Sequence, residues 1–172
     1  MTLLAVGSPA YDTIETPSGR AEEVLGGAAT YFAYAASFFG PVRLVGPVGT
    51  DFLDADRALL SDREVDLEGL ATKPGETFRW SVRYGKDLKA TTLETRLNVF
   101  DGYLPEIPKA FQDSRFVFLA NSAPAMQLRA LEQLSSESFT VMDSMDLWIE
   151  EQRPDLERVL RRVDMVILND EE

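Results

Sequence analysis

The chemistry open to this chain is narrow, because its 172 residues include no His and no Cys. A Ser-His-Asp triad, a Cys nucleophile, a His-based zinc site and a disulfide framework are therefore impossible within it. Catalysis or ligand binding must use carboxylates, Lys, Arg, Tyr, hydroxyl groups, backbone dipoles or a hard metal such as Mg²⁺. The candidate residues are therefore carboxylates and segments of backbone without side chains.

Asp12 is the first candidate carboxylate. It follows the apolar run 3–7, which predicts a central strand, and it lies in a turn and second short strand over residues 8–14. In open parallel sheets, ligands bind beyond the carboxyl ends of the strands. Asp12 is therefore expected at a ligand-binding edge. The alternative is that Asp12 only caps a turn.

Gly26 and Gly27 open a predicted helix that ends at Gly40. No formal charge occurs from residue 28 to residue 39, so we expect this helix to be buried on all sides. The glycine pair leaves the helix entrance without side chains, and a ligand could approach free backbone N–H groups there. The alternative is that the glycines only make a tight turn into a core helix.

The remaining pattern predicts a layered α/β fold, because strands and helices alternate along the chain. The expected strands are 3–7, 42–46, 115–120, 139–143 and 163–168, and the expected helices are 26–40, 52–64, 124–134 and 154–163. Thr50 or Asp51 is suited to cap the second helix.

Residues 67–104 depart from this pattern. Residues 77–84 and 91–100 alternate strictly between apolar and polar, which is typical of half-exposed strands. We interpret 67–104 as a small antiparallel insertion beside a core of residues 1–66 and 105–172. The aromatic face of its first strand carries Phe78, Trp80, Val82 and Tyr84, and it covers a substrate, the main domain or another copy of the protein. Packing against protein is the favoured choice.

Composition excludes several partners. The chain has 29 acidic and 17 basic residues and a formal net charge of -12, which argues against binding nucleic acid or an anionic membrane. No run of 18 apolar residues predicts a membrane span. The first residues lack the basic region of a signal peptide, so a cytoplasmic location is expected.

The last residues look like the start of a helix. Asn169 is a good N-cap, and Glu172 stands three positions later, as in a capping box. The sequence stops where that helix would continue, so we expect a truncated chain. A natural acidic tail is the alternative.

Together these motifs resemble the N-terminal half of the PfkB (ribokinase-like) carbohydrate and nucleoside kinases. The resemblance covers essentially all 172 residues. It rests on the strand and aspartate of residues 6–12, the glycine pair and Ala-rich helix of 26–40, the glycine-rich segment 45–51, the insertion at 67–104 and the Asn-x-x-Glu of 169–172. It implies a Rossmann-like three-layer α/β/α fold with a small antiparallel β-lid.

The resemblance also implies an activity, namely transfer of the γ-phosphoryl group of ATP to a hydroxyl of a sugar or nucleoside. Asp12 would hold substrate hydroxyls, and Gly26 and Gly27 would let the substrate approach closely. Asn98, on the polar face of a lid strand, and Asn121, after the strand 115–120, would add contacts. Asn169 and Glu172 would help to place Mg²⁺ and phosphate oxygens, with Glu172 acting on the metal through water.

Two departures from the family pattern matter. Tyr31 stands where the family often has an Asn that contacts the sugar, which suggests a larger or less polar substrate. The Gly-Ala-Gly-Asp motif that supplies the catalytic base is absent, and no Gly-x-Gly-Asp occurs anywhere. The chain therefore offers no catalytic residue, and we expect these 172 residues alone to be inactive although the parent enzyme is a kinase.

Other functions remain open from sequence alone. One is a non-catalytic binding or dimerisation module, in which the aromatic face of the lid pairs two copies as a homodimer. A dinucleotide-binding Rossmann domain is weaker, because residues 7–10 lack the glycine fingerprint. The sequence does not distinguish a hexose, a keto-sugar acid, ribose and a nucleoside as the phosphate acceptor.

Overall fold

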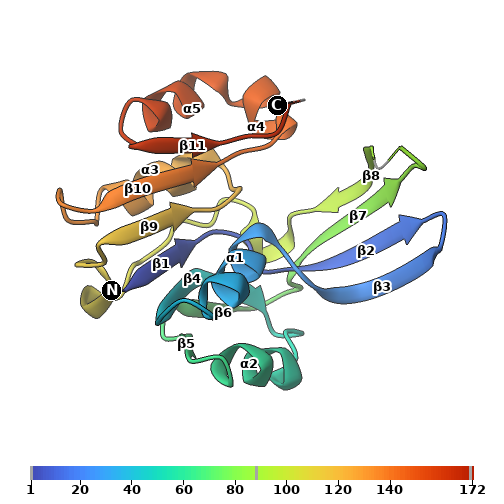
Figure 1. The fold of residues 1–172 in the computed structure, drawn as a ribbon, viewed down its shortest axis with the longest axis horizontal. Coiled ribbons are helices and arrows are strands. Elements are labelled where there is room, and N and C mark those ends of the chain that lie inside the picture. Colours follow the sequence, from blue (N-terminus) through green and yellow to red (C-terminus); the bar gives the residue numbers. More distant parts are fainter. Residues whose placement is uncertain (1, 88, 171) are drawn as a thin grey trace.

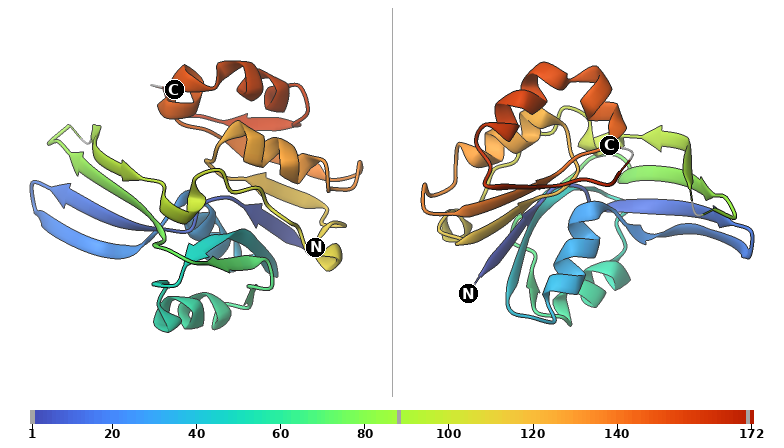
Figure 2. Two further views of the ribbon diagram at one scale, coloured as in Figure 1. Left: turned by 180° about the vertical axis from the view of Figure 1, so that it is seen from behind. Right: turned by 45° about the horizontal axis from the view of Figure 1, so that its top comes forward.

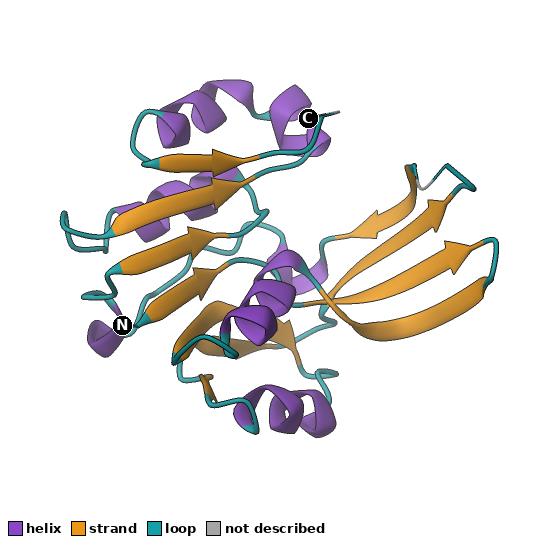
Figure 3. Ribbon diagram, in the orientation of Figure 1, coloured by secondary structure: helices purple, strands orange, loops and turns teal. Residues whose placement is uncertain are grey.

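A computed structural model describes residues 2–87, 89–170 and 172, and it contains a main sheet with a smaller sheet beside it (Figures 1 and 3). The main sheet has the strand order β11-β10-β9-β1-β4-β5, β6 also pairs with β4, and all of these pairings are parallel. Its strands are β1 (Leu3–Val6), β4 (Val42–Gly49), β5 (Val65–Asp66), β6 (Leu70–Lys73), β9 (Phe116–Leu119), β10 (Phe139–Asp143) and β11 (Met165–Ile167).

Helices cover both faces of the main sheet (Figure 2). The helices are α1 (Ala28–Ala36) and α2 (Asp54–Ser61) on one face, and α3 (Pro124–Leu131), α4 (Asp146–Glu151) and α5 (Arg153–Leu160) on the other. The alternation of β1 explains this, since Ala5 packs in the cluster with α1 and α2, whereas Leu4 and Val6 pack in the cluster with α3 and α5. The expected three-layer α/β/α fold is confirmed. Within the described residues, no helix has the length and apolar character needed to cross a membrane.

Helix α1 is shorter and less buried than expected. It ends at Ala36, and only its face of Ala29, Thr30, Ala33 and Ala36 is buried. Tyr31 is 54% exposed, and Phe39 in the following turn is 84% exposed. The prediction of burial on all sides was wrong, because a nine-residue helix laid on a sheet covers one stripe of its surface.

The smaller sheet, which we call the lid sheet, has the strand order β3-β2-β7-β8. Its strands are β2 (Ala10–Thr16), β3 (Gly19–Gly26), β7 (Phe78–Tyr84) and β8 (Ala90–Arg96). Two outer pairings are antiparallel, but β2 and β7 pair in parallel at the centre.

The strand membership expected for 67–104 therefore needs correction in two places. Residues 10–26 supply half of the lid sheet, while β6, which lies within 67–104, joins the main sheet. Strand β3 escaped prediction because it is a largely exposed edge strand with consecutive charges at Glu22 and Glu23, so it shows no apolar alternation. A position with positive φ at Glu23 and a shift in register after Asp12 interrupt it further.

The register of the lid sheet puts the aromatic side chains on the same face as Asp12. Asp12 pairs with Trp80 across β2 and β7, and Ala10 pairs with Phe78. The opposite face carries ion pairs, among them Arg83 Nε to Glu15 Oε2 at 2.8 Å. One face of the lid sheet thus meets the carboxyl edge of the main sheet, and the other is charged.

Candidate functional site

A cavity of about 210 Å³ lies between the base of the lid sheet and the carboxyl edge of the main sheet. Four predicted site residues meet there, namely Asp12, Gly27, Tyr31 and Asn121. They come from β2, the residue before α1, the first turn of α1 and the segment after β9. The full lining is Ser8, Asp12, Gly27, Ala28, Tyr31, Phe78, Trp80, Asn121 and Met145.

Asp12 is the buried carboxylate of this cavity, with only 4% of its surface exposed. Its Oδ2 accepts a hydrogen bond from the Gly27 N–H at 3.4 Å. Burial raises the pKa of Asp12 to about 6, while that N–H acts in the opposite direction. At neutral pH the group is therefore a largely ionised acceptor in a poorly hydrated place, which suits it to receive hydroxyl donors from a ligand.

The glycine pair serves Asp12 directly. A Cβ added to Gly26 would overlap the Asp12 carboxylate, so only glycine leaves room for that side chain. Gly27 has φ +89, and a Cβ there would overlap the Ser8 carbonyl oxygen. The pair therefore makes the turn into α1 and leaves room for Asp12, and the Gly27 N–H is bonded to Asp12 instead of being free. Close approach of a ligand at this pair stays a prediction.

Tyr31 stands beside Asp12 at the entrance of α1. Its backbone N–H donates to the Gly27 carbonyl at 3.0 Å, which fixes the first turn. Partial burial raises the pKa of the Tyr31 hydroxyl, and the charge of Asp12 and the neighbouring Tyr84 raise it further. The phenol thus remains protonated and offers a ring face together with one hydroxyl.

Asn121 is held by buried neighbours. Trp148 Nε1 donates to Asn121 Oδ1 at 2.9 Å, and Ser8 Oγ donates to the Asn121 carbonyl at 3.3 Å. Sequence reasoning missed Ser8, Met145 and Trp148 as parts of this site. Ser8 had a signal, since it follows the first strand directly, whereas Trp148 lies on α4, which the pattern did not predict.

Asn98 lies elsewhere. The expected position on a lid strand was wrong, because β8 ends at Arg96 and Asn98 begins a 3₁₀ turn, η1 (Asn98–Phe100), with φ +50. Its Nδ2 donates to the Thr77 carbonyl at 2.9 Å. It is absent from the cavity lining and instead secures the start of β7.

Asn169 and Glu172 form the expected capping pair. The Asn169 N–H donates to Glu172 Oε2 at 2.9 Å, and the Glu172 N–H donates to Asn169 Oδ1 at 3.1 Å. Neither residue lines the cavity. Asp143, at the end of β10, lies near them: burial raises its pKa to about 6, and the charge of Glu172 adds to this.

The carboxylates near Asn169 could hold Mg²⁺ only together with water and substrate phosphates. Among the described residues, no cluster of three or more His, Cys, Asp or Glu could hold a metal ion. Mg²⁺ commonly keeps several waters and takes one or two carboxylates together with substrate phosphates. Asp143 and Glu172 are the carboxylates that could contribute to such a site.

Arg79 joins the lid sheet to the core behind the cavity. Its Nη2 lies 2.8 Å from Asp51 Oδ2, its Nε lies 2.8 Å from Glu23 Oε2, and its Nη1 donates to the Thr77 carbonyl at 2.9 Å. Asp51 Oδ1 also accepts from the Thr77 N–H at 2.8 Å and the Thr77 hydroxyl at 2.7 Å. Burial alone would raise the pKa of Asp51, but Thr77 and Arg79 hold it below its ordinary value.

Asp51 therefore has a different partner from the one expected. It does not cap α2, whose N-cap is Leu53 with no side-chain cap. Because the glycine-rich segment reaches the start of β7 through Asp51, it fixes how the lid sheet leaves the core.

Comparison with known proteins shows what this arrangement is similar to. No family model matches the chain. A cytidine kinase of Thermococcus kodakarensis is 31% identical over 177 residues, which cover 100% of this chain and 63% of that enzyme. The chain thus spans less than two thirds of the relative that it matches.

Solved structures agree on the fold. A nucleoside kinase of Burkholderia thailandensis in complex with inosine has a TM-score of 0.84 at 18% identity, covering 99% of this chain and 61% of that one. The nucleoside kinase of Methanocaldococcus jannaschii, an archaeal member of the ribokinase family, has a TM-score of 0.77 at 17% identity with the same coverage. In sequence the chain is similar to a cytidine kinase, and in fold it is similar to nucleoside kinases of the ribokinase-like fold, over about 60% of the length of each.

Proposed function

We propose that this chain is the acceptor-binding part of a kinase that transfers the γ-phosphoryl group of ATP to a hydroxyl of a nucleoside. The observation that carries this is the cavity that Asp12 lines together with Tyr31, Phe78 and Trp80. A buried carboxylate receives sugar hydroxyls, and aromatic walls accept a planar base. The names of the cytidine kinase and of the inosine-bound relative support a nucleoside over a free sugar.

The part that Asp12 plays is orientation. Phosphoryl transfer depends mainly on positioning and on charge stabilisation, so a fixed acceptor for the hydroxyls of the sugar directs the reacting hydroxyl. The lid sheet contributes Phe78 and Trp80 as walls that keep water from the bound molecule. Tyr31 lines the same cavity, is close enough to feel the charge of Asp12, and adds a donor.

ATP and Mg²⁺ belong to the proposed reaction. Asn169 and Glu172 would help to hold the metal and phosphate oxygens, with Glu172 acting through water. Mg²⁺ supplies neutralisation of the charge that develops on the phosphates.

We also propose that the 172 residues alone bind the acceptor without phosphorylating it. They contain no Gly-x-Gly-Asp sequence, and loss of a general base typically lowers the rate by about 10²–10⁴-fold. Phosphoryl transfer by the purified chain, above the level of a vector control, would contradict this part of the proposal.

The substrate class is tested by calorimetric titration of the chain with inosine, cytidine and free ribose at pH 7. We expect both nucleosides to bind at least ten times more tightly than ribose, because ribose has no base to pack against the aromatic rings of the cavity. Equal affinity for ribose and the nucleosides would make the site a sugar site instead.

A further inference from the structure

The Asn121 side chain has only one part of its amide left for a ligand. The side-chain Oδ1 accepts from Trp148 Nε1 at 2.9 Å. The backbone carbonyl of Asn121 accepts from Ser8 Oγ at 3.3 Å. Its backbone N–H lowers the pKa of Asp143, so this group too has a neighbour. Trp148 and Ser8 are both buried, which shields these contacts from water.

The direction of the amide follows from the chemistry of its partner. An indole N–H donates and never accepts, so Oδ1 must be the end that faces Trp148. The NH₂ group then forms the opposite end, on a residue that lines the cavity. The orientation is set by the donor and not by a choice between two equivalent fits.

Trp148 itself lies behind the cavity wall. It is 5% exposed and does not line the cavity of Asp12. It instead lines a separate groove together with Leu147 and Ala123. The indole N–H of Trp148 reaches the Asp12 cavity through Asn121, whereas its backbone N–H donates to the carbonyl of Met145, another lining residue, at 3.0 Å. An effect of the indole N–H alone is therefore expected to pass through Asn121.

We propose that Trp148 is a positioning residue that locks Asn121 as a hydrogen-bond donor in the substrate cavity, so that the site selects a nucleoside that presents an acceptor atom to it. This inference rests on the proposed function. Asp12 supplies a fixed acceptor in the same cavity, whose lining also includes the aromatic rings. The complementary ligand offers a hydroxyl donor to Asp12 and a carbonyl oxygen, ring nitrogen or hydroxyl oxygen to Asn121.

A double-mutant cycle tests the coupling. Inosine affinity is measured by calorimetry for the unchanged chain, Trp148→Phe, Asn121→Ala and the double variant. Phe keeps a ring and loses only the N–H, and one neutral hydrogen bond corresponds to about 2–10-fold in affinity. We expect Trp148→Phe to weaken binding about 3-fold when Asn121 is present and to have no further effect in Asn121→Ala. The same loss in both backgrounds, or no loss in either, would overturn the proposal.

The variant Asn121→Asp provides a second test of the donor role of Asn121. The carboxylate still accepts from Trp148, but it offers a lone pair where Asn121 offers NH₂. We expect it to weaken inosine binding more than Asn121→Ala does, because acceptor then faces acceptor. Affinity equal to that of the unchanged chain would mean that the site does not use a donor at this position.

A readout without ligand separates this inference from the proposed function. In ¹⁵N–¹H spectra, Asn121→Ala should shift the Trp148 indole N–H resonance and speed its hydrogen exchange. The Trp80 indole, which donates to Thr92 Oγ1 at 3.3 Å, is the internal reference. Absence of inosine binding by the unchanged chain overturns the nucleoside assignment, whereas an unmoved Trp148 resonance overturns the positioning role alone.

Discussion

At the scale of single residues, Asp12 is unusual because it is buried without a cation. Within the described part of the chain, no Lys or Arg forms an ion pair with it, and its one hydrogen bond comes from Gly27. A buried carboxylate with so little compensation costs stability in its ionised form. A ligand that donates hydroxyl protons to Asp12 would relieve that cost, which is a reason for the site to bind.

Asp12→Asn should therefore stabilise the chain in a pH-dependent way. The folded-state pKa of about 6 lies above the ordinary value of 3.8, so the folded chain holds the proton more tightly and loses stability as pH rises from 4 to 7. The variant has no such loss. We expect it to match the unchanged chain at pH 4 and to exceed it by about 1–3 kcal/mol at pH 7 in urea unfolding. A difference that is constant with pH would contradict the assigned cause.

Gly27→Ala should damage both fold and site. The added Cβ meets the Ser8 carbonyl and the backbone has φ +89, so the backbone must shift at an expected cost of about 3 kcal/mol. Gly102→Ala is the matched control, since Gly102 has φ +62 with nothing within 4 Å of the added Cβ. It should cost only about 1 kcal/mol from the left-handed backbone. Equal losses in thermal unfolding would show that crowding at Gly27 is unimportant.

At the scale of elements, the position of the lid sheet depends on a charged anchor at its base. Arg79 contacts Asp51 from the core, Glu23 from β3 and the Thr77 carbonyl beside β7. Its guanidinium also lies 5.6 Å from the centre of the Tyr11 ring. Asp12 and Trp80 follow Tyr11 and Arg79 directly in sequence, so this anchor holds the two strands that carry the cavity wall.

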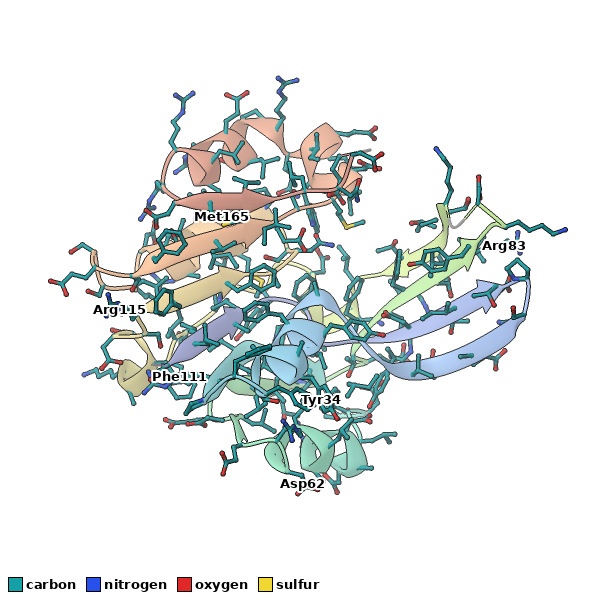
Figure 4. The ribbon with its side chains drawn as sticks, viewed as in Figure 1. Tyr34, Asp62, Arg83, Phe111, Arg115 and Met165 are labelled. Carbon is teal, nitrogen blue, oxygen red and sulfur yellow. The ribbon has the colours of Figure 1, made fainter. Side chains whose placement is uncertain are left out.

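Arg79→Met tests the anchor against a neighbour on the same strand. Arg79 has 15% of its side chain exposed and Arg83 has 59%, and both pair with glutamates. Figure 4 shows Arg83 at the outer part of the lid sheet, away from the core. We expect Arg79→Met to lower the free energy of unfolding by about 3 kcal/mol, because Asp51 loses its cation. Arg83→Met should change it by less than about 0.5 kcal/mol.

The measurement is urea unfolding of both variants together with inosine titration. If Arg79→Met and Arg83→Met behave alike, then the base of the lid sheet is held by strand pairing and not by the anchor.

At the scale of the whole molecule, the sequence predicted the layered core well. Strands such as β1 and β10 are short apolar runs bounded by turn residues, and their alternation with helices leaves few other folds. It predicted strand membership of the lid sheet poorly, because β3 is charged and exposed and the parallel pairing of β2 with β7 joins distant segments.

The residues of the candidate site also include some that the sequence predicted and others that it did not. Asp12, Gly27 and Asn121 were predictable, because each lies near the end of a predicted strand or the start of a predicted helix. Trp148, Arg79 and the true place of Asn98 depend on contacts across more than 20 residues of chain, which no local pattern records. The pairing of Asn169 with Glu172 was visible from spacing alone, whereas their proposed relation to Mg²⁺ and a homodimer through the lid stay predictions.

The most direct test of the central claim is calorimetric titration of inosine into the unchanged chain, Asp12→Asn and Glu15→Gln at pH 7. Glu15 is the matched control, because it lies on the same strand but faces the charged side of the lid sheet. A nucleoside site built on Asp12 predicts that Asp12→Asn binds at least ten times more weakly, as expected for loss of a hydrogen bond to a charged group, and that Glu15→Gln binds normally. Inosine affinity that is the same in all three proteins, or no binding by the folded unchanged chain, would contradict the account.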